Sequence, residues 1–392
     1  MSPSDTCENE QLIMAALRRE VPEKVPSFVQ SIMTRLTQEY LERFEETIDD
    51  DNVILTKIGD FTVYKGFGFA SHWSGTPEAK IVVDDALRDE LVRMEEECSR
   101  QGHPEYRVND LGSIRATNKI TNWFVEPGIK TDAQMRFFLD HLAVKPPPAS
   151  EVEAWREGRR QCMDADFVPF ASHHVVVEPN NTSVSFGLTA KLMRKNPMLL
   201  NEWFDFIIQL PELSFKAAVD AGAKLFCTAD DCAYKTGPMF HPAQYREFVT
   251  PRAKCLCDLV HDAGGLIFMH TDGFIDPIMD CFIDAGYDAV QPIETTSMRD
   301  DQGESIRRVK QKWGNKLAVI GNCDTTAILS FGTPEDVRVD VHRCFREARG
   351  KEEEIAGYVF AASGSLHDKI CLDNALAMMD EYKKLRDNEI PI

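Results

Sequence analysis

The sequence lacks the signals that mark several large classes of protein. It contains no run of about 20 apolar residues that could cross a bilayer, no Cys-x-x-Cys pair, and no Gly-x-Gly-x-x-Gly loop. Basic residues are also scarce, because 44 Lys and Arg face 64 Asp and Glu, for a net charge of −20. We therefore expect neither nucleic acid nor a membrane as a partner, since their anionic surfaces would repel the chain.

Two further absences favour a cytoplasmic protein. The start, Met1 to Glu10, is polar and acidic, so the basic segment and apolar stretch of a secretory signal are missing. The 11 cysteines are odd in number and scattered, which favours reduced thiols over a disulfide framework. The hydrophobic fraction of 43% is ordinary for a globular chain with a sizeable core.

The first 150 residues show a mixed pattern that ends at a proline-rich break, Pro146–Pro148. Apolar residues at helical spacing predict helices over Glu10–Arg19, Ile32–Glu46, Asp84–Cys98 and Asp132–Leu142. Strand-like runs are expected over Asn52–Trp73 and Tyr106–Pro127. We expect residues 1–150 to form a mostly helical extension that packs on a barrel spanning residues 151–392.

After the break, short apolar runs alternate regularly with amphipathic helices. The runs are Val175–Glu178, Lys224–Thr228, Gly265–Met269, Tyr287–Gln291, Lys316–Ile320 and Gly357–Ala361. The helices are Pro197–Ala221, His241–Ala263, Asp276–Ala285, Ser305–Trp313, Pro334–Arg349 and Asp373–Leu385. This alternation predicts parallel strands with helical crossovers, and its length suits an α/β fold of the (β/α)8 TIM-barrel type. A doubly wound sheet is the alternative, but its glycine-rich phosphate loop is missing.

Polar residues follow the predicted strands, where the active site of a barrel forms. They are Asp230 and Asp231, His270 and Asp272, Glu294, Asn322 and Asp324, and Ser363, Ser365 and His367. We expect these strand ends to converge on one cavity, with Asp230, Asp231, His270 and Glu294 as catalytic candidates. Asp272, Asn322, Asp324 and His367 are the expected substrate-binding residues.

Each of these residues also has a structural interpretation. Asp230 or Asp231 could cap the helix that begins near His241, whereas two adjacent carboxylates in a pocket would raise one pKa and create an acid or base. His270 and Asp272 are two positions apart, so on an extended segment both can face a metal ion. Glu294 could be a rim acid, and Asp324 could cap a helix near Thr326.

Several short sequence segments together resemble the uroporphyrinogen decarboxylase superfamily. They are Asp230–Gly237, Pro242–Phe248 with Pro251, His270–Gly273, Ala285–Asp288, Gly321–Asp324 and Gly332–Val337. The resemblance covers about residues 181–382 and implies a barrel with its cleft at the strand ends. Decarboxylases of this superfamily carry an N-terminal arginine pair that holds substrate carboxylates, but the matching segment here, Val25–Ile32, contains no arginine.

The resemblance therefore favours the superfamily's corrinoid-dependent methyltransferases, in particular the first methyltransferase of O-demethylases. These would move a methyl group from a methoxylated small molecule to the Co(I) corrinoid of a partner protein. Thiol-methylating members bind zinc through His-x-Cys and a later Cys; here His270 is kept, Asp272 replaces the Cys, and the last strand offers only Ser363–Ser365.

A harder zinc site of His270 and Asp272 would suit an ether oxygen better than a thiol. The alternatives are a uroporphyrinogen decarboxylase-like enzyme and a non-catalytic ligand-binding barrel. A homodimer is one candidate for the oligomeric state.

Overall fold

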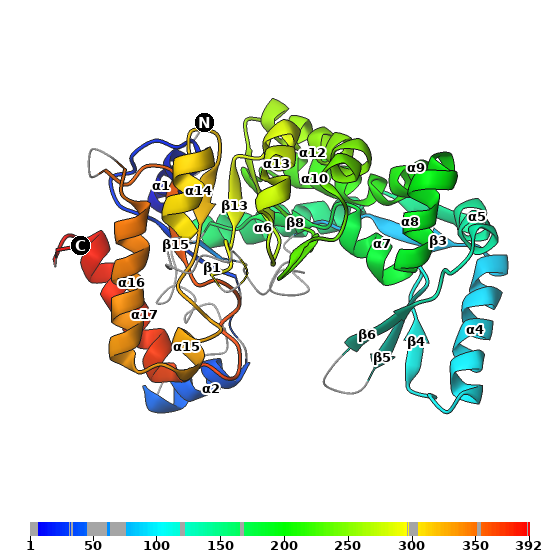
Figure 1. Ribbon diagram of the computed structural model, residues 1–392, viewed down its shortest axis with the longest axis horizontal. Coiled ribbons are helices and arrows are strands. Elements are labelled where there is room, and N and C mark those ends of the chain that lie inside the picture. The colour runs from blue at the N-terminus through cyan, green and yellow to red at the C-terminus, as the bar shows by residue number, and fades with distance from the viewer. Residues whose placement is uncertain are drawn as a thin grey trace.

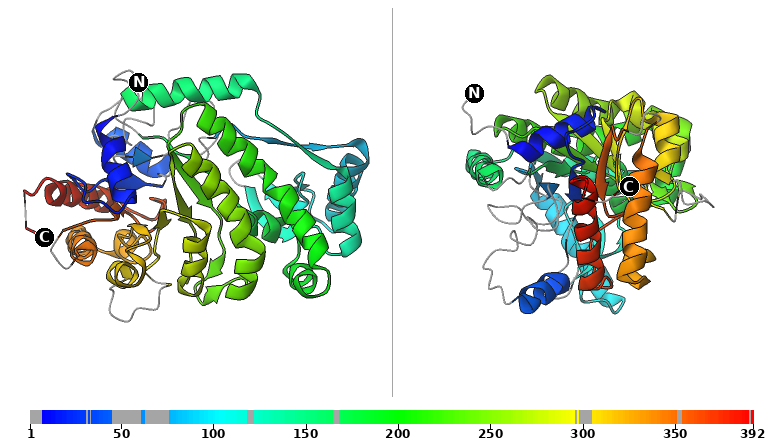
Figure 2. Two further views of the ribbon diagram at one scale, coloured as in Figure 1. Left: turned by 90° about the horizontal axis from the view of Figure 1, so that it is seen from above. Right: turned by 90° about the vertical axis from the view of Figure 1, so that its left-hand side faces the viewer.

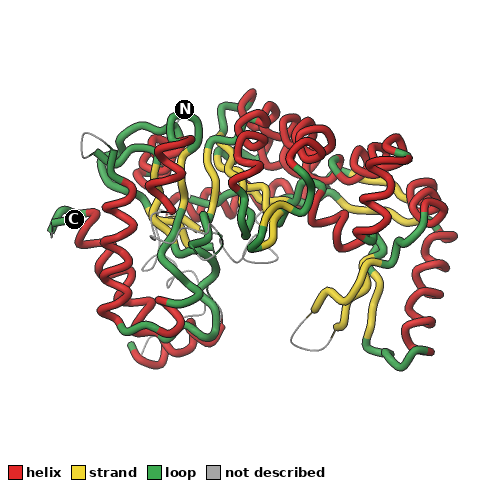
Figure 3. Tube along the Cα trace, viewed as in Figure 1, coloured by secondary structure: helices red, strands yellow, loops and turns green. Residues whose placement is uncertain are grey.

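The computed structural model of the protein describes residues 7–30, 32, 34–44, 61–62, 76–117, 122–164, 168–295, 297, 305–350, 354–389 and 391–392. Its centre is a curled sheet of eight parallel strands surrounded by helices (Figures 1 and 3). This is the α/β architecture of a TIM-type barrel, as the alternating pattern of the sequence predicts.

The barrel strands pair in the order β2-β1-β15-β14-β13-β12-β9-β8. Their bounds are β1 Ser27–Val29, β2 Phe61–Thr62, β8 Ala171–His173, β9 Leu225–Ala229, β12 Leu266–His270, β13 Ala289–Gln291, β14 Ala318–Ile320 and β15 Tyr358–Ala361. The last five coincide with predicted apolar runs, and their residues are buried throughout. Continuous burial is what parallel strands covered by helices require.

One predicted strand is wrong. The apolar run Val175–Glu178 is not extended: β8 ends at His173, and helix α7 occupies Val177–Ser183. The backbone N–H groups of Val176, Val177 and Glu178 donate to the carboxylate of Asp230. This tertiary contact fixes a helix start that local hydrophobicity does not reveal.

Helices α10, α12, α14 and α16 pack against strands of the sheet (Figure 2), whereas α8 and α9 lie beside α5, Asp132–His141 (Figure 1). The helices of the second half are α6 Ala149–Asp164, α8 Phe186–Lys195, α9 Pro197–Ile207, α10 Gln209–Asp220, α11 Pro242–Gln244, α12 Thr250–Asp262, α13 Met279–Ala285, α14 Ser305–Trp313, α15 Ile328–Phe331, α16 Pro334–Ala348 and α17 Leu372–Arg386. The single helix expected over Pro197–Ala221 is divided into α9 and α10. The one expected over His241–Ala263 includes a π turn, η1 Tyr245–Val249, and a 3-10 turn, η2 Asp276–Ile278, precedes α13.

The N-terminal helix α1, Glu8–Leu17, closes one end of the barrel. Its Ile13 and Leu17 belong to the same buried cluster as Leu225 and Leu266, the first residues of β9 and β12. Aromatic rings fill the interior above them, since the ring centroids of Phe28, Phe170 and Phe268 lie 5.5 to 5.8 Å apart. The packed end is thus the N-terminal one, and chemistry is left to the C-terminal ends of the strands.

An antiparallel region is inserted between β2 and β8 and lies at the end of the molecule away from α16 and α17 (Figure 1). It contains β3 Lys80–Val83, α4 Asp85–Arg100, β4 Tyr106–Val108, β5 Ser113–Thr117, β6 Asn122–Pro127, α5 Asp132–His141 and β7 Leu142–Lys145. Strands β4, β5 and β6 form one sheet, and β3 pairs with β7. None of the helices in the described ranges is long and apolar enough to cross a membrane.

The expected division at residue 150 therefore does not separate the barrel from an extension. Strands β1 and β2 precede that point, yet β1 pairs in parallel with β15 and β2 pairs with β1. Helix α2, Thr34–Arg43, lies between them in sequence. Of the strands expected over residues 52–73, β2 is the described part; the remainder lies outside the described residues.

Candidate active site

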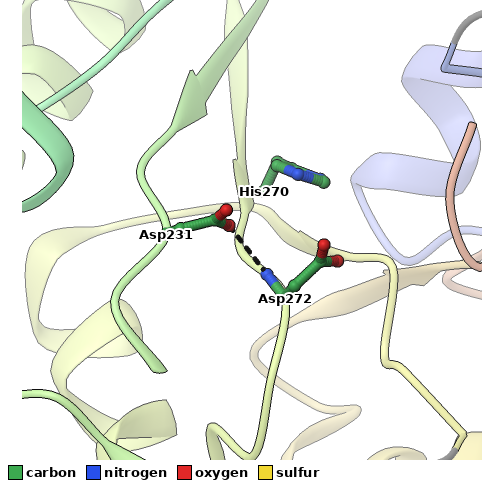
Figure 4. Close-up of side chains that lie close together, drawn as sticks. All are labelled: Asp231, His270 and Asp272. Atoms are coloured by element: carbon green, nitrogen blue, oxygen red, sulfur yellow. Dashed lines mark hydrogen bonds between the residues drawn. The ribbon is translucent and has the colours of Figure 1, made fainter. Parts of the chain in front are cut away.

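Three polar side chains converge at the C-terminal ends of β9 and β12 (Figure 4). One potential ligand atom from each of Asp231, His270 and Asp272 lies within 4.8 Å of those of the other two. Oδ1 of Asp231 accepts a hydrogen bond from the backbone N–H of Asp272 at 3.1 Å, which joins the two strand ends. The structure thus brings together the expected His270–Asp272 pair and adds Asp231 to it.

The ring of His270 is held in one orientation by the neighbouring strand. His270 is the last residue of β12 and lies opposite Gln291 of β13 in the parallel register. Its Nδ1 contacts Oε1 of Gln291, and Nε2 of that amide donates to Oε1 of Gln30 at 3.5 Å. Because an amide oxygen only accepts, Nδ1 carries the proton, and Nε2 is the ring atom that can offer a lone pair.

The loop after His270 depends on a glycine. Gly273 has φ +94°, and a Cβ at this position would lie 2.6 Å from the carbonyl oxygen of Ala233. The close approach sets the loop against the hairpin of β10, Ala233–Tyr234, and β11, Gly237–Pro238. The N–H of Gly273 also donates to Oε2 of Glu294 at 3.1 Å, so Glu294 lies beside the cluster.

The carboxylates of this cluster are electrostatically crowded. Desolvation raises the pKa of Asp272 to about 6; His270 opposes the shift, whereas Asp231 and Glu294 add to it. A carboxyl group with such a pKa can exchange protons near neutral pH, and a cation would relieve the repulsion. The donor set of one imidazole and two carboxylates fits a divalent metal ion such as zinc.

Asp230 has a different surrounding from its neighbour Asp231. Its side chain is completely buried, and it accepts hydrogen bonds from the N–H groups of Val176 (3.3 Å), Val177 (3.0 Å) and Glu178 (2.9 Å). Burial raises its pKa to about 6, although the N–H groups and His174 act in the opposite direction. Asp230 does cap a helix, but the helix is α7; the turn after His241 is capped by Nδ1 of His241 itself.

A second histidine, absent from the candidates chosen by sequence, lies next to Asp230. Nδ1 of His174 is 2.5 Å from the carbonyl oxygen of Ala229 and 3.1 Å from Oε2 of Glu178. The sequence does not reveal His174 and Glu178 as a pair, because the apolar pattern of Val175–Glu178 predicts a strand. That prediction places the end of the strand after His174. The pair His173-His174 directly after Ala171–Ser172 is the signal that would have found it.

The candidates Asn322, Asp324 and His367 form hydrogen bonds that stabilise the fold. Asn322 is fully buried; its Nδ2 donates to the carbonyl of Ile293 (2.6 Å) and to Oγ of Ser305 (2.8 Å). Oδ1 of Asp324 accepts from the N–H groups of Thr326 (2.7 Å) and Ala327 (2.9 Å), which is the capping role that the sequence left open.

Nδ1 of His367 accepts from the N–H of Lys369 at 3.2 Å, and its Nε2 lies 3.4 Å from Oγ of Ser330. These contacts hold a turn after β15 rather than reaching the cluster. We therefore restrict the candidate site to Asp231, His270, Asp272 and Glu294, with Asp230, His174 and Glu178 beside it.

Comparison with known proteins places this site in a family. The family model for uroporphyrinogen decarboxylase (URO-D) matches residues 169–385, from just before β8 into the last turn of α17. The chain belongs to the URO-D family. The matched range contains every residue of the candidate site.

Individual relatives of this URO-D family member are distant. It is 24% identical over 189 residues to a uroporphyrinogen decarboxylase of Synechococcus sp. (strain CC9605), and 24% identical over 188 residues to one of Parasynechococcus marenigrum (strain WH8102). These alignments cover 47% of the chain and 48% of each relative, so the chain spans about half the length of the curated relatives it matches.

The fold is shared more widely than the sequence. A methyltransferase from Methanosarcina mazei superposes with a TM-score of 0.61 at 14% sequence identity, over 96% of this chain and 98% of that one. The superposition extends over nearly the whole of both chains. It supports the architecture, while activity has to be argued from the site.

Proposed function

We propose that this URO-D family protein is a methyltransferase. It would transfer a methyl group from a methoxylated small molecule, an aryl methyl ether, to the Co(I) corrinoid of a partner protein. The observation that carries the proposal is the Asp231–His270–Asp272 cluster at the barrel mouth, where an oriented imidazole faces two carboxylates. Cleavage of an ether needs such groups, because an alkoxide or phenolate leaves poorly without a proton or a cation.

Zinc fits the cluster on the chemistry of its donors. Nε2 of His270 and the carboxylates of Asp231 and Asp272 would hold the ion, and Gln291 would supply the outer contact that orients a metal-binding histidine. When bound, the ion would supply Lewis acidity toward the ether oxygen. Glu294 would keep the Asp272 loop in place through the N–H of Gly273.

The structure gives a reason to prefer this activity over decarboxylation of a porphyrinogen. The segment that would carry the arginine pair forms β1 and its flanks, and among its described residues Gln30 contacts Gln291, the partner of His270. A neutral amide does not neutralise substrate carboxylates near Asp231 and Asp272. Decarboxylation nevertheless remains the second candidate, because both curated relatives carry that name.

The decisive experiment mixes the purified protein with free cob(I)alamin and a panel of aryl methyl ethers. We expect methylcobalamin to form, as followed by its absorption spectrum, and His270→Ala to abolish the reaction. Absence of methylcobalamin with every donor would contradict the proposal, and release of CO2 from uroporphyrinogen would establish the second candidate. Ligand binding without either reaction, unchanged in carboxylate variants, would indicate a non-catalytic barrel.

Metal analysis of the same preparations separates the ligand question from the activity. We expect zinc in the wild-type protein and a loss of it in His270→Ala and Asp272→Asn. A stoichiometric metal in all three preparations would place the ion elsewhere. The corrinoid-carrying partner and a homodimer stay predictions, to be tested by co-purification and by the mass of the particle in solution.

A further inference from the structure

The His174–Glu178 pair lies at the same barrel mouth as the metal-binding candidates. His174 follows β8, and Glu178 lies in the first turn of α7. Burial raises the pKa of the Glu178 carboxyl, but His174, the backbone N–H of Asp231 and His270 outweigh it and lower that pKa, so Glu178 lies near both Asp231 and His270. A substrate bound at the cluster would therefore meet this pair as well.

The geometry leaves one nitrogen of His174 available to a ligand. Nδ1 is held by two acceptors, the carbonyl oxygen of Ala229 and the carboxylate of Glu178. The imidazole nevertheless keeps 44% of its side-chain surface exposed, and Glu178 keeps 37%. Because Nδ1 is held as a donor, Nε2–H of a protonated ring is the group that can donate to a ligand.

The groups around His174 favour its charged form. Burial acts against the charge, but Glu178 on α7, Asp230 after β9 and the carbonyl of Ala229 outweigh it and raise the pKa of His174 to about 9. The opposing neighbour is His173 on β8, whose own pKa is lowered to about 4, first by burial and then by the charge of His174. The pKa values of these two adjacent histidines are thus shifted to opposite sides of neutral pH.

Glu178 is not required to start helix α7. Asp230 already accepts the N–H groups of Val176, Val177 and Glu178. Thr182 supports the same helix from within, since its Oγ1 donates to the carbonyl of Glu178. The carboxylate of Glu178 is left to act on His174, which is the arrangement of an oriented acid and its supporting carboxylate.

We infer that His174, held by Glu178, is the catalytic acid that protonates the ether oxygen as the methyl group leaves. This inference rests on the proposed methyltransferase function and assigns its leaving-group chemistry. The methyl carbon forms its new bond with an electron pair from cobalt, so Co(I) becomes Co(III). The C–O bonding pair stays on oxygen, which takes the proton from Nε2 of His174, and the products are the methylated corrinoid and the phenol.

The chemistry of the leaving group agrees with this role. A phenol has a pKa of about 10, as in tyrosine, and a donor group works best when it is protonated at working pH yet acidic enough to release its proton. His174 meets both conditions near neutral pH. His270 serves the cluster through Nε2 and therefore does not have to act as this acid.

A series of donors with different leaving groups tests the inference. We expect His174→Gln to lower kcat by about 100-fold for an unsubstituted methoxybenzene-type donor. The loss should shrink to about fivefold for a nitro-substituted donor, whose phenolate leaves without help. KM should change little in both cases. A loss of the same size for every donor would overturn the role of His174 as an acid.

His173→Gln is the matched control, because it changes the adjacent histidine. In this variant kcat should depend on the leaving group as it does in the wild type. Glu178→Gln should lower the pH at which activity falls on the basic side, because it removes the carboxylate that keeps His174 protonated. An unchanged basic limb would contradict the supporting role of Glu178.

Two measurements do not require turnover. NMR titration of the histidines should show a His174 pKa above 8 in the wild type and a lower one in Glu178→Gln. Binding of phenol, the product class, should weaken at least tenfold in His174→Gln. If no methoxylated compound is ever demethylated while both results hold, the proposed function fails, but His174 still stands as a proton-donating binding site. If demethylation occurs and neither result holds, the assignment of His174 fails alone.

Discussion

The strand ends of the barrel divide into two groups that look alike in sequence and behave differently in the structure. After β9 and β12, the polar side chains of Asp231, His270 and Asp272 face one another. After β14, the side chains of Asn322 and Asp324 are hydrogen-bonded to the main chain. Backbone N–H groups donate to carboxylates in both groups, but near β14 the guanidinium of Arg343 is a further partner, whereas near β12 several acidic side chains lie close together.

Arg343 of α16 explains much of the second group. Its guanidinium donates to Oδ1 of Asn322 at 3.2 Å, to Oδ1 of Asp340 at 2.6 Å and to Oε1 of Glu347 at 3.0 Å. The network neutralises acids and satisfies a buried amide at the same time. No cation of this kind is hydrogen-bonded to Asp231 or Asp272 among the contacts within the described ranges, so that cluster keeps its capacity to bind something else.

The strongest test of this contrast removes the imidazole from the cluster. His270→Ala should lower the rate of methyl transfer by about 1000-fold, equivalent to about 4 kcal/mol of activation free energy. The reason is that the substitution removes the imidazole that is held by Gln291 and that we propose as a metal ligand. The rate is measured as methylcobalamin formed per folded molecule.

The matched variant in the other group is Asp324→Asn, which keeps an acceptor for the N–H groups of Thr326 and Ala327. It should retain at least about half of the wild-type rate. A loss comparable to that of His270→Ala would mean that both groups of strand ends take part in the chemistry, and the contrast would fail.

The next effect concerns stability rather than rate. Asn322→Ala should lower the free energy of unfolding by about 3 kcal/mol. It leaves the carbonyl of Ile293, Oγ of Ser305 and two N–H groups of Arg343 without this buried partner. Urea denaturation followed by circular dichroism measures the change.

The same variant separates stability from activity. Below its unfolding transition, Asn322→Ala should form methylcobalamin within about twofold of the wild-type rate per folded molecule. Unchanged stability together with a large loss of rate would show that Asn322 meets the substrate, as the sequence first suggested.

The sequence predicted most of the barrel because its strands combine continuous apolar runs with glycine-marked helix ends. Lys224–Thr228 and Gly265–Met269 became β9 and β12 within one residue. It also predicted that His270 and Asp272 share a face, since this depends only on the two-residue period of extended chain. Both features are local, and local patterns are visible in a single sequence.

The errors have a common physical origin in contacts between distant segments. The helical start at Val177 depends on Asp230, 53 positions away. The inclusion of β1 and β2 in the barrel depends on pairing with β15 near the other end of the chain. Whether the polar side chains at a strand end are hydrogen-bonded by the scaffold depends on partners such as Arg343. The position of Arg343 relative to Asn322 follows only from the folded helix.

The smallest expected effect removes the cap that Asp324 provides. Asp324→Ala should lower the free energy of unfolding by about 1 kcal/mol, the usual value of a lost side-chain cap. Two N–H groups of the turn before α15 lose their acceptor, and Oγ1 of Thr295 loses a contact of 2.9 Å. Because Thr295 follows Glu294, a shift there would be transmitted to the Gly273 loop. A decrease in methyl-transfer rate larger than the stability change explains would therefore connect the two groups of strand ends, whereas an unchanged rate would show that the scaffold around β14 can be weakened without disturbing the cluster at β12.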